Sequence, residues 1–234
     1  MTNFAEQQDM RYAARLASRF SPRSRADSPP VVGGAFKRGF DIAGALVGIV
    51  LFSPLLLMLA ALVKLSDGGS VVYGHRRIGH NGTVFRCWKF RTMVANGDEV
   101  LAAHLVANPR DREEWNATRK LQNDPRVTRV GAVLRKLSLD ELPQIVNILR
   151  GEMSFVGPRP VVKDELELYG KAAAIYLRSR PGLTGLWQVS GRNDVSYETR
   201  VAFDRHYVEN WSLGADLKIL VRTVPAVFSS RGSY

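Results

Sequence analysis

An uncharged apolar segment, residues 42–63, is the feature of this sequence that most constrains what the chain can fold into. As a helix that rises about 1.5 Å per residue, it is long enough to cross a hydrocarbon core of roughly 30 Å. A Ser53-Pro54 pair lies at its middle. Because proline has no N–H to donate and clashes with the carbonyl one turn earlier, we expect a kink or a break there.

Basic residues lie on both sides of this segment, with Lys37 and Arg38 before it and Lys64 after it. Positive charge near a membrane segment favours the cytoplasmic side, and here both ends carry it. A re-entrant hairpin with arms over 42–52 and 55–63, each about 14–17 Å long, would satisfy both ends. The residues alone leave this hairpin and a single kinked span equally open.

The charge of the chain indicates what it binds. The 33 Lys and Arg exceed the 22 Asp and Glu, so the net charge of +11 favours anionic partners: lipid headgroups, phosphorylated ligands or nucleic acid. The single cysteine, Cys87, excludes an intramolecular disulfide. We expect a flexible basic arm over residues 1–35, the membrane segment over 36–66 and one soluble domain over 67–234.

The soluble part predicts an α+β fold that is mainly helical. The Asn81-Gly82 pair between two β-prone segments predicts a hairpin. Helical patterns cover residues 97–121, 134–149 and 161–177. Residues 181–191 contain four turn-forming residues and predict a loop. The last apolar segment, 213–228, suits an amphipathic helix that lies either in the membrane interface or against a core.

Two adjacent carboxylates, Asp140 and Glu141, are the first candidates for chemistry. They lie in Ser138-Leu-Asp-Glu-Leu-Pro143, and a proline is tolerated only in the first turn of a helix, so a helix should begin close to Asp140. The positive end of that helix favours negative charge. Because Ser138 and Glu141 also spell a capping box, the residues leave helix capping and catalysis both open.

Cations and rigid turns occur in three other short motifs. They are Lys89-Phe-Arg91-Thr-Met93, Arg135, and Gly157-Pro-Arg159-Pro160. Arginine binds phosphate with a planar fork, and a divalent metal held by acidic oxygens would neutralise remaining charge. Each cation alone is typical of a solvated surface, so only their convergence would form a site.

With these motifs the chain resembles the bacterial sugar transferases, monotopic phosphoglycosyl transferases that start glycan assembly on polyprenol phosphate. The similarity runs from about Lys37 to Thr223. The motifs that carry it are Lys37-Arg38, Ser53-Pro54, Lys89-Phe-Arg-Thr-Met93, Asp124-Pro-Arg126, Ser138-Leu-Asp-Glu-Leu-Pro143, Met153-Ser-Phe-Val-Gly-Pro-Arg-Pro160, Arg180-Pro-Gly-Leu-Thr-Gly185 and Gly191-Arg-Asn193. Some members carry an added N-terminal region with several membrane spans. We expect the short form without that region here, and this form looks most like the exopolysaccharide-initiating members that transfer galactose- or glucose-phosphate.

The resemblance implies a re-entrant membrane helix and a catalytic domain on the cytoplasmic face of the bacterial inner membrane. Asp140 would be the nucleophile, and Glu141 would help to hold Mg²⁺. Phosphate oxygens would be held by Lys89, Arg91, Arg135 and Arg159, with Arg192 and Asp216 as weaker candidates. The implied reaction moves a sugar 1-phosphate from a UDP-sugar to undecaprenyl phosphate through a covalent aspartyl intermediate.

Other functions remain as alternatives. The main one is a non-catalytic, membrane-tethered protein that binds anionic lipid or phosphorylated sugar. Aromatic residues interleaved with cations over 85–91 also fit nucleic-acid binding, which we disfavour because no nucleic-acid motif accompanies them. The four histidines lack the spacing of zinc ligands. The identity of the sugar and self-association of the chain stay open.

Overall fold

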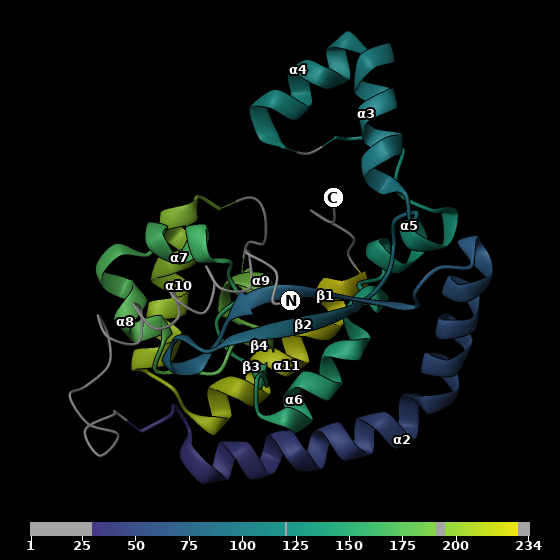
Figure 1. Cartoon of the computed structure of the whole chain (residues 1–234). Coiled ribbons are helices and arrows are strands. Elements are labelled where there is room, and N and C mark those ends of the chain that lie inside the picture. Colours follow the sequence, from purple (N-terminus) through teal and green to yellow (C-terminus); the bar gives the residue numbers. More distant parts are fainter. Residues whose placement is uncertain (1–29, 120, 191–194, 229–234) are drawn as a thin grey trace, which may run out of the picture. The chain divides into compact units, whose positions relative to one another are not determined.

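The structure, a computed structural model, describes residues 30–119, 121–190 and 195–228, and most of the predicted basic arm lies outside them. The described chain is mainly helical with two small sheets (Figure 1). The α-helices are α2 (Gly34–Asp67), α3 (Gly97–Ala107), α4 (Pro109–Thr118), α5 (Arg129–Lys136), α6 (Ile145–Arg150), α7 (Lys163–Leu168), α8 (Ala173–Tyr176), α9 (Leu186–Ser190), α10 (Tyr197–Glu209) and α11 (Leu213–Phe228). The 3₁₀ helices are η2 (His80–Gly82), η3 (Leu139–Gln144) and η4 (Gly170–Ala172). The strands are β1 (Val72–Ile78), β2 (Val84–Phe90), β3 (Ser154–Val156) and β4 (Gly182–Thr184).

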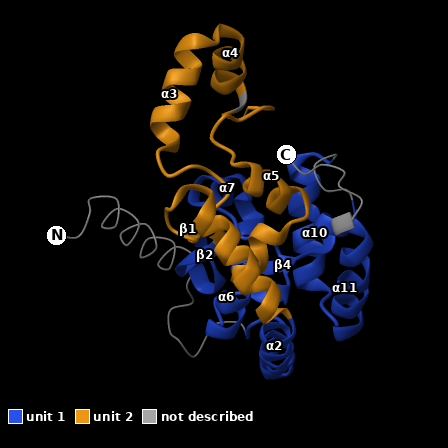
Figure 2. Cartoon of the chain, turned by 90° about the vertical axis from the view of Figure 1, so that its right-hand side faces the viewer, with its two compact units in different colours: residues 1–51, 74–88, 144–232 blue, residues 52–73, 89–143, 233–234 orange. Residues whose placement is uncertain are grey.

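The chain divides into two compact units, which Figure 2 colours separately. Unit 1 comprises residues 1–51, 74–88 and 144–232, and unit 2 comprises residues 52–73, 89–143 and 233–234. This division falls within α2, and the domain boundary predicted at the end of the apolar segment stays a prediction. Each unit therefore contains about one half of the apolar helix and its own core.

The apolar segment is one long helix, α2, and Pro54 lies inside it. By length and composition α2 is apolar enough to cross a membrane, and most of its apolar window is not covered by the rest of the chain. Val50 and Leu57, for example, are 76% and 72% exposed. The expected break at Pro54 does not end the helix, because a proline removes one backbone hydrogen bond and the rest of the ladder persists. The long apolar helix is confirmed, and its re-entrant course stays a prediction.

Unit 1 is built around the parallel pair of β3 and β4, in which Ser154 pairs with Gly182 and Val156 with Thr184. The loop expected over 181–191 is therefore wrong, because this segment forms β4 and α9. Gly182 is needed for close packing rather than for a turn, since a Cβ there would overlap the backbone of Gly157. A short strand of this kind is set by a distant partner, which local turn propensity does not report.

Unit 2 has an apolar cluster that joins the second half of α2 to the soluble elements. Leu59 and Val63 of α2 are buried there with Phe90 and Leu134. Partly buried residues packed against this cluster include Leu55, Leu56, Val130, Leu139 and Leu142. The turn that carries the two candidate carboxylates is thus fixed by its leucines onto the apolar helix.

Most other predicted elements are confirmed with revised boundaries. The hairpin is β1 and β2 joined by η2, whose Asn81 has a φ of 53°. The helical pattern predicted over 97–121 contains two helices, α3 and α4, because Pro109 begins the second. The helical pattern over 134–149 is divided among α5, η3 and α6. The segment 213–228 is one helix, α11.

Candidate active site

The adjacent carboxylates lie on η3, directly after a strained residue. Ser138 has a φ of 55°, which is the left-handed region that non-glycine residues rarely adopt. Its carbonyl accepts a hydrogen bond from the Glu141 N–H at 3.3 Å. An N-cap serine is normally extended and accepts through its hydroxyl, so this geometry differs from a capping box. The strained turn instead sets the direction in which Asp140 and Glu141 leave the backbone.

Lys89, at the end of β2, lies between the two carboxylates. Its Nζ is 2.6 Å from Glu141 Oε1 and 3.5 Å from Asp140 Oδ2. The Asp140 side chain is only 13% exposed, whereas those of Lys89 and Glu141 are each 33% exposed. Burial raises the pKa of Asp140 above its usual value, and the charge of Lys89 partly opposes that increase. Asp140 is therefore a desolvated carboxylate kept beside one cation.

Arg135 is positioned by the segment that follows Lys89. Thr92 is buried, and its Oγ1 accepts a hydrogen bond from Arg135 Nε at 2.9 Å. A Cβ at Gly131 would overlap the Thr92 carbonyl, so only glycine lets α5 approach this closely. The Thr128 hydroxyl caps α5 by accepting the Gly131 N–H. Lys89, Arg135 and Asp140 thus belong to unit 2, and their role in a phosphate site stays a prediction.

Arg91, also predicted to hold phosphate, pairs with the carboxylate of Asp67 at the end of α2. Asp67 accepts further hydrogen bonds from the N–H groups of Gly69 and Ala95. Arg91 thus connects the end of the apolar helix to the segment that contains Lys89 and Thr92. Its role as a phosphate ligand stays a prediction.

The remaining predicted ligands belong to unit 1. Arg159 is exposed, and its guanidinium lies over the Trp187 ring, with 5.8 Å from Cζ to the ring centroid. Arg200, on α10, lies over the same ring at 5.0 Å. Such cation–π contacts orient a guanidinium without neutralising its charge. Arg192 lies outside the residues that the structure describes.

Asp216 is fully engaged inside unit 1. Lys37 Nζ lies 2.5 Å from its Oδ2, which also accepts the Trp211 Nε1–H at 3.0 Å. Its Oδ1 accepts the Tyr207 hydroxyl at 2.7 Å. These contacts join the start of α2 to α11, so the geometry favours a structural role for this carboxylate over a phosphate site.

Arg38 anchors the start of α2 by another route. Its two terminal nitrogens donate to the carbonyls of Ile148 and Leu149 at 2.5 and 2.7 Å, where α6 ends. Unsatisfied carbonyls at a helix C-terminus attract a cation. Lys37 and Arg38, predicted from the sequence only as residues that flank the hairpin, therefore fix the helix to unit 1.

The donor set at η3 suits a magnesium ion shared with a ligand. Within the described residues, no group of three or more His, Cys, Asp or Glu side chains gathers as a metal site. Mg²⁺, however, commonly takes one or two carboxylates together with substrate phosphates and water. Asp140 and Glu141 fit that mode, because they are adjacent and face a common cation.

Three residues that shape these sites were not predicted from the sequence. Thr92 holds Arg135, Asp67 holds Arg91, and Arg200 shares Trp187 with Arg159. Thr92 lies inside a motif that was singled out for its charges alone. The pairing of Asp67 with Arg91 and of Arg200 with Trp187 depends on tertiary contacts that no local pattern signals.

Comparison with known proteins identifies the family of the chain. The family model described as bacterial sugar transferase matches residues 32–230. The chain is 68% identical, over 96% of its length and 100% of the relative, to the exopolysaccharide production protein ExoY of Rhizobium meliloti. It is 52% identical to the undecaprenyl-phosphate galactose phosphotransferase of Salmonella typhimurium, over 85% of this chain and 41% of that protein.

A more distant relative points the same way. The UDP-glucose:undecaprenyl-phosphate glucose-1-phosphate transferase of Escherichia coli is 39% identical, over 85% of this chain and 41% of that protein. The family model covers most of the chain, and the similarity to ExoY extends over nearly all of it. The chain therefore belongs to the bacterial sugar transferase family, and it is a transferase enzyme.

Proposed function

We propose that the protein transfers a sugar 1-phosphate from a UDP-sugar to undecaprenyl phosphate, as the first membrane step of exopolysaccharide synthesis. The observation that carries the proposal is the turn η3: its carboxylates meet Lys89, and its leucines pack on the apolar helix α2. This turn joins a charged reaction centre to a membrane segment. The names of the relatives, which include transferases acting on undecaprenyl phosphate, support the same substrates.

Asp140 is the proposed nucleophile. Its carboxylate oxygen bonds to the phosphorus that carries the sugar, the bond from that phosphorus to the UMP oxygen breaks, and UMP leaves with its electron pair. A phosphate oxygen of undecaprenyl phosphate then attacks the same phosphorus and releases the aspartate. The covalent intermediate separates the two transfers, so the soluble and the lipid substrate need not be bound together.

The environment of Asp140 suits this role. Its carboxylate is buried and poorly solvated, which makes it more reactive once ionised, and Lys89 favours the ionised form. Lys89 and Arg135 bring positive charge to the position where a diphosphate must approach a carboxylate. Without that charge, the phosphate oxygens would repel the nucleophile. Arg159, which the family resemblance implies as a phosphate ligand, stays a prediction.

Asp140 and Glu141 are the residues that would hold Mg²⁺. When bound, the ion would neutralise phosphate charge as a Lewis acid. Glu141 is the better candidate for a permanent ligand, because its side chain is 33% exposed and that of Asp140 only 13%. This assignment leaves Asp140 free to attack.

The membrane arrangement follows from α2. Positive charge at both ends of the helix and Pro54 at its middle favour a helix that enters and leaves by the cytoplasmic face of the inner membrane. In unit 2, Leu59 and Val63 pack with Leu139 and Leu142, so a membrane-inserted α2 holds Asp140 close to the lipid surface. A single span would instead place Lys37 and Lys64 on opposite sides.

The proposal is tested with purified full-length protein, undecaprenyl phosphate and a panel of UDP-sugars. We expect multiple-turnover release of UMP that depends on both substrates and is abolished by chelation of Mg²⁺. Asp140→Asn should remove activity, whereas Asp98→Asn, an exposed aspartate in α3 of the same unit, should not. Undiminished turnover by the Asp140→Asn variant would exclude this residue as the nucleophile.

A further inference from the structure

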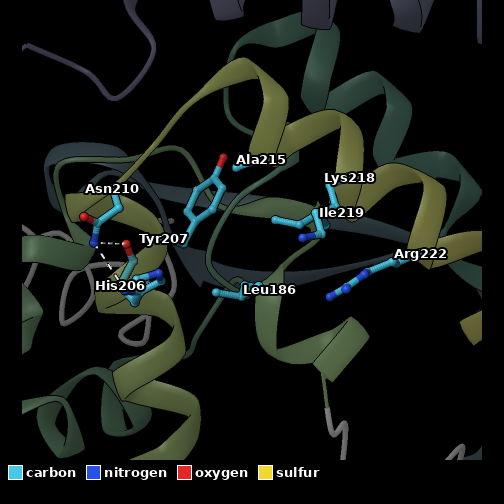
Figure 3. A pocket seen from close by; sticks show the side chains of 8 residues that line it. All are labelled: Leu186, His206, Tyr207, Asn210, Ala215, Lys218, Ile219 and Arg222. Carbon is cyan, nitrogen blue, oxygen red and sulfur yellow. Dashed lines mark hydrogen bonds between the residues drawn. The ribbon is translucent and has the colours of Figure 1, made fainter.

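Unit 1 contains a pocket that the proposed chemistry does not use. It lies among α9, α10 and α11 and has a volume of about 130 Å³, below the roughly 300 Å³ at which pockets for drug-sized ligands begin. It can hold a phosphate-sized group but not a sugar nucleotide. Figure 3 shows the eight residues that line it: Leu186, His206, Tyr207, Asn210, Ala215, Lys218, Ile219 and Arg222.

The charge of this pocket has one sign. Lys218 and Arg222 extend from α11 toward Leu186 (Figure 3), and no acidic residue is among the residues that line the pocket. Both cations are exposed, and neither forms an ion pair or a hydrogen bond with another residue of the described chain. Like charges four residues apart on a helix repel each other. An anion between them would relieve that repulsion.

The outer side of α11 beside the pocket is apolar. Leu217, Val221 and Val224 are 46%, 72% and 59% exposed and recur at helical spacing. The opposite face of the helix is buried through Asp216 and Ile219. An exposed apolar stripe flanked by basic side chains is typical of a helix that lies in a membrane interface.

Together these features select one occupant. The apolar stripe fits acyl chains, and the two cations beside it lie where the phosphates of lipids would be. We propose that the pocket binds the phosphodiester headgroup of an anionic membrane lipid, paired with Lys218 and Arg222 above the apolar floor of Leu186 and Ile219. This inference rests on the proposed membrane placement, and it adds a lipid site to α11 that is separate from the residues assigned to catalysis.

The test uses full-length protein in zwitterionic micelles, with its thermal unfolding midpoint followed during titration. The probes are short-chain phosphatidylglycerol, short-chain phosphatidylcholine and inorganic phosphate. A ligand that binds only the folded state raises the midpoint. We compare the wild type with Lys218→Gln/Arg222→Gln and with the control Lys171→Gln/Arg110→Gln, which removes two exposed charges outside the pocket.

We expect phosphatidylglycerol to raise the midpoint saturably in the wild type and the control. The pocket variant should require about tenfold more lipid or worse, since each basic side chain contributes on the order of 1 kcal/mol near anionic lipid. Equal responses of pocket variant and wild type, or equal effects of phosphatidylcholine or of inorganic phosphate, would overturn the assignment. UMP release by the pocket variant with detergent-solubilised substrates should persist, which separates this test from that of the proposed function.

Discussion

The buried ion pair between Lys37 and Asp216 offers a quantitative test of how α2 is held on unit 1. The two side chains are 6% and 1% exposed, and the charged atoms are 2.5 Å apart. We consider the replacements Lys37→Met and Asp216→Leu, singly and together. The two single changes should differ, because they leave different groups without a partner.

Lys37→Met leaves Asp216 with two donors, the Tyr207 hydroxyl and the Trp211 indole N–H. We expect it to lower the free energy of unfolding by about 1.5–3 kcal/mol, the worth of a hydrogen bond to a charged group. Asp216→Leu leaves the Lys37 ammonium buried without its counter-ion. Breaking a buried pair in this way costs about 3–5 kcal/mol.

The double variant should be less destabilised than Asp216→Leu alone. Neither member of the pair is then left without its counter-ion, and the Tyr207 hydroxyl retains the Val156 carbonyl at 3.0 Å as an acceptor. Only the Trp211 N–H loses its partner, at about 1–3 kcal/mol. The coupling energy between the two sites should therefore be at least about 1.5 kcal/mol.

The assay is urea unfolding of the full chain in micelles, followed by tryptophan fluorescence. The exposed pair Arg205 and Glu209 on α10 serves as the control, with a coupling expected below about 0.5 kcal/mol. Additive effects of Lys37→Met and Asp216→Leu would refute the reasoning, because they would mean that the two groups do not depend on each other.

Three further changes test other parts of the structure. Burial raises the pKa of Asp204 to about 7, so the folded state binds more protons than the unfolded state between about pH 4 and 7, and stability falls as pH rises through that range. The stability of Asp204→Asn relative to wild type, measured by thermal unfolding, should therefore grow from pH 5 to pH 8. A difference that does not change with pH would contradict this. Gly182→Ala should cost about 1–3 kcal/mol or more in urea unfolding, because the added methyl overlaps the backbone of Gly157, while Gly214→Ala, with open space at its Cβ, should not destabilise the protein. Thr92→Val should lower kcat/KM about tenfold by releasing Arg135, and Thr92→Ser, which keeps the hydroxyl, should retain the wild-type value. Equal kcat/KM of the wild type and both variants would show that Thr92 does not position Arg135.

Local chemistry predicted much of the fold. Pro143 indicated where a helical segment begins, Asn81-Gly82 marked the hairpin, and periodicity identified α11. These signals are local, because they depend on backbone conformations that a few neighbouring residues determine. The motif residues Lys89, Arg135 and Asp140 were likewise found from residue type and order.

Tertiary pairing accounts for what the sequence did not reveal. The segment predicted as a loop after Pro181 is a strand, because β3 pairs with it and its glycines permit close approach. Asp216 was predicted as a ligand from its residue type. In the structure its carboxylate accepts hydrogen bonds from Lys37, Tyr207 and Trp211. The left-handed backbone of Ser138 was likewise not predicted, because the sequence around it matches a capping box, in which the serine is extended.

The central claim is that Asp140 carries the phosphosugar during turnover. It is tested most directly by incubating the full-length enzyme with a single UDP-sugar and Mg²⁺, followed by peptide mass spectrometry after rapid quenching. We expect a sugar-phosphate adduct on the peptide containing Asp140, which undecaprenyl phosphate releases and which the Asp140→Asn variant does not form. An enzyme that turns over without forming the adduct, or that forms it on another residue, would contradict the account.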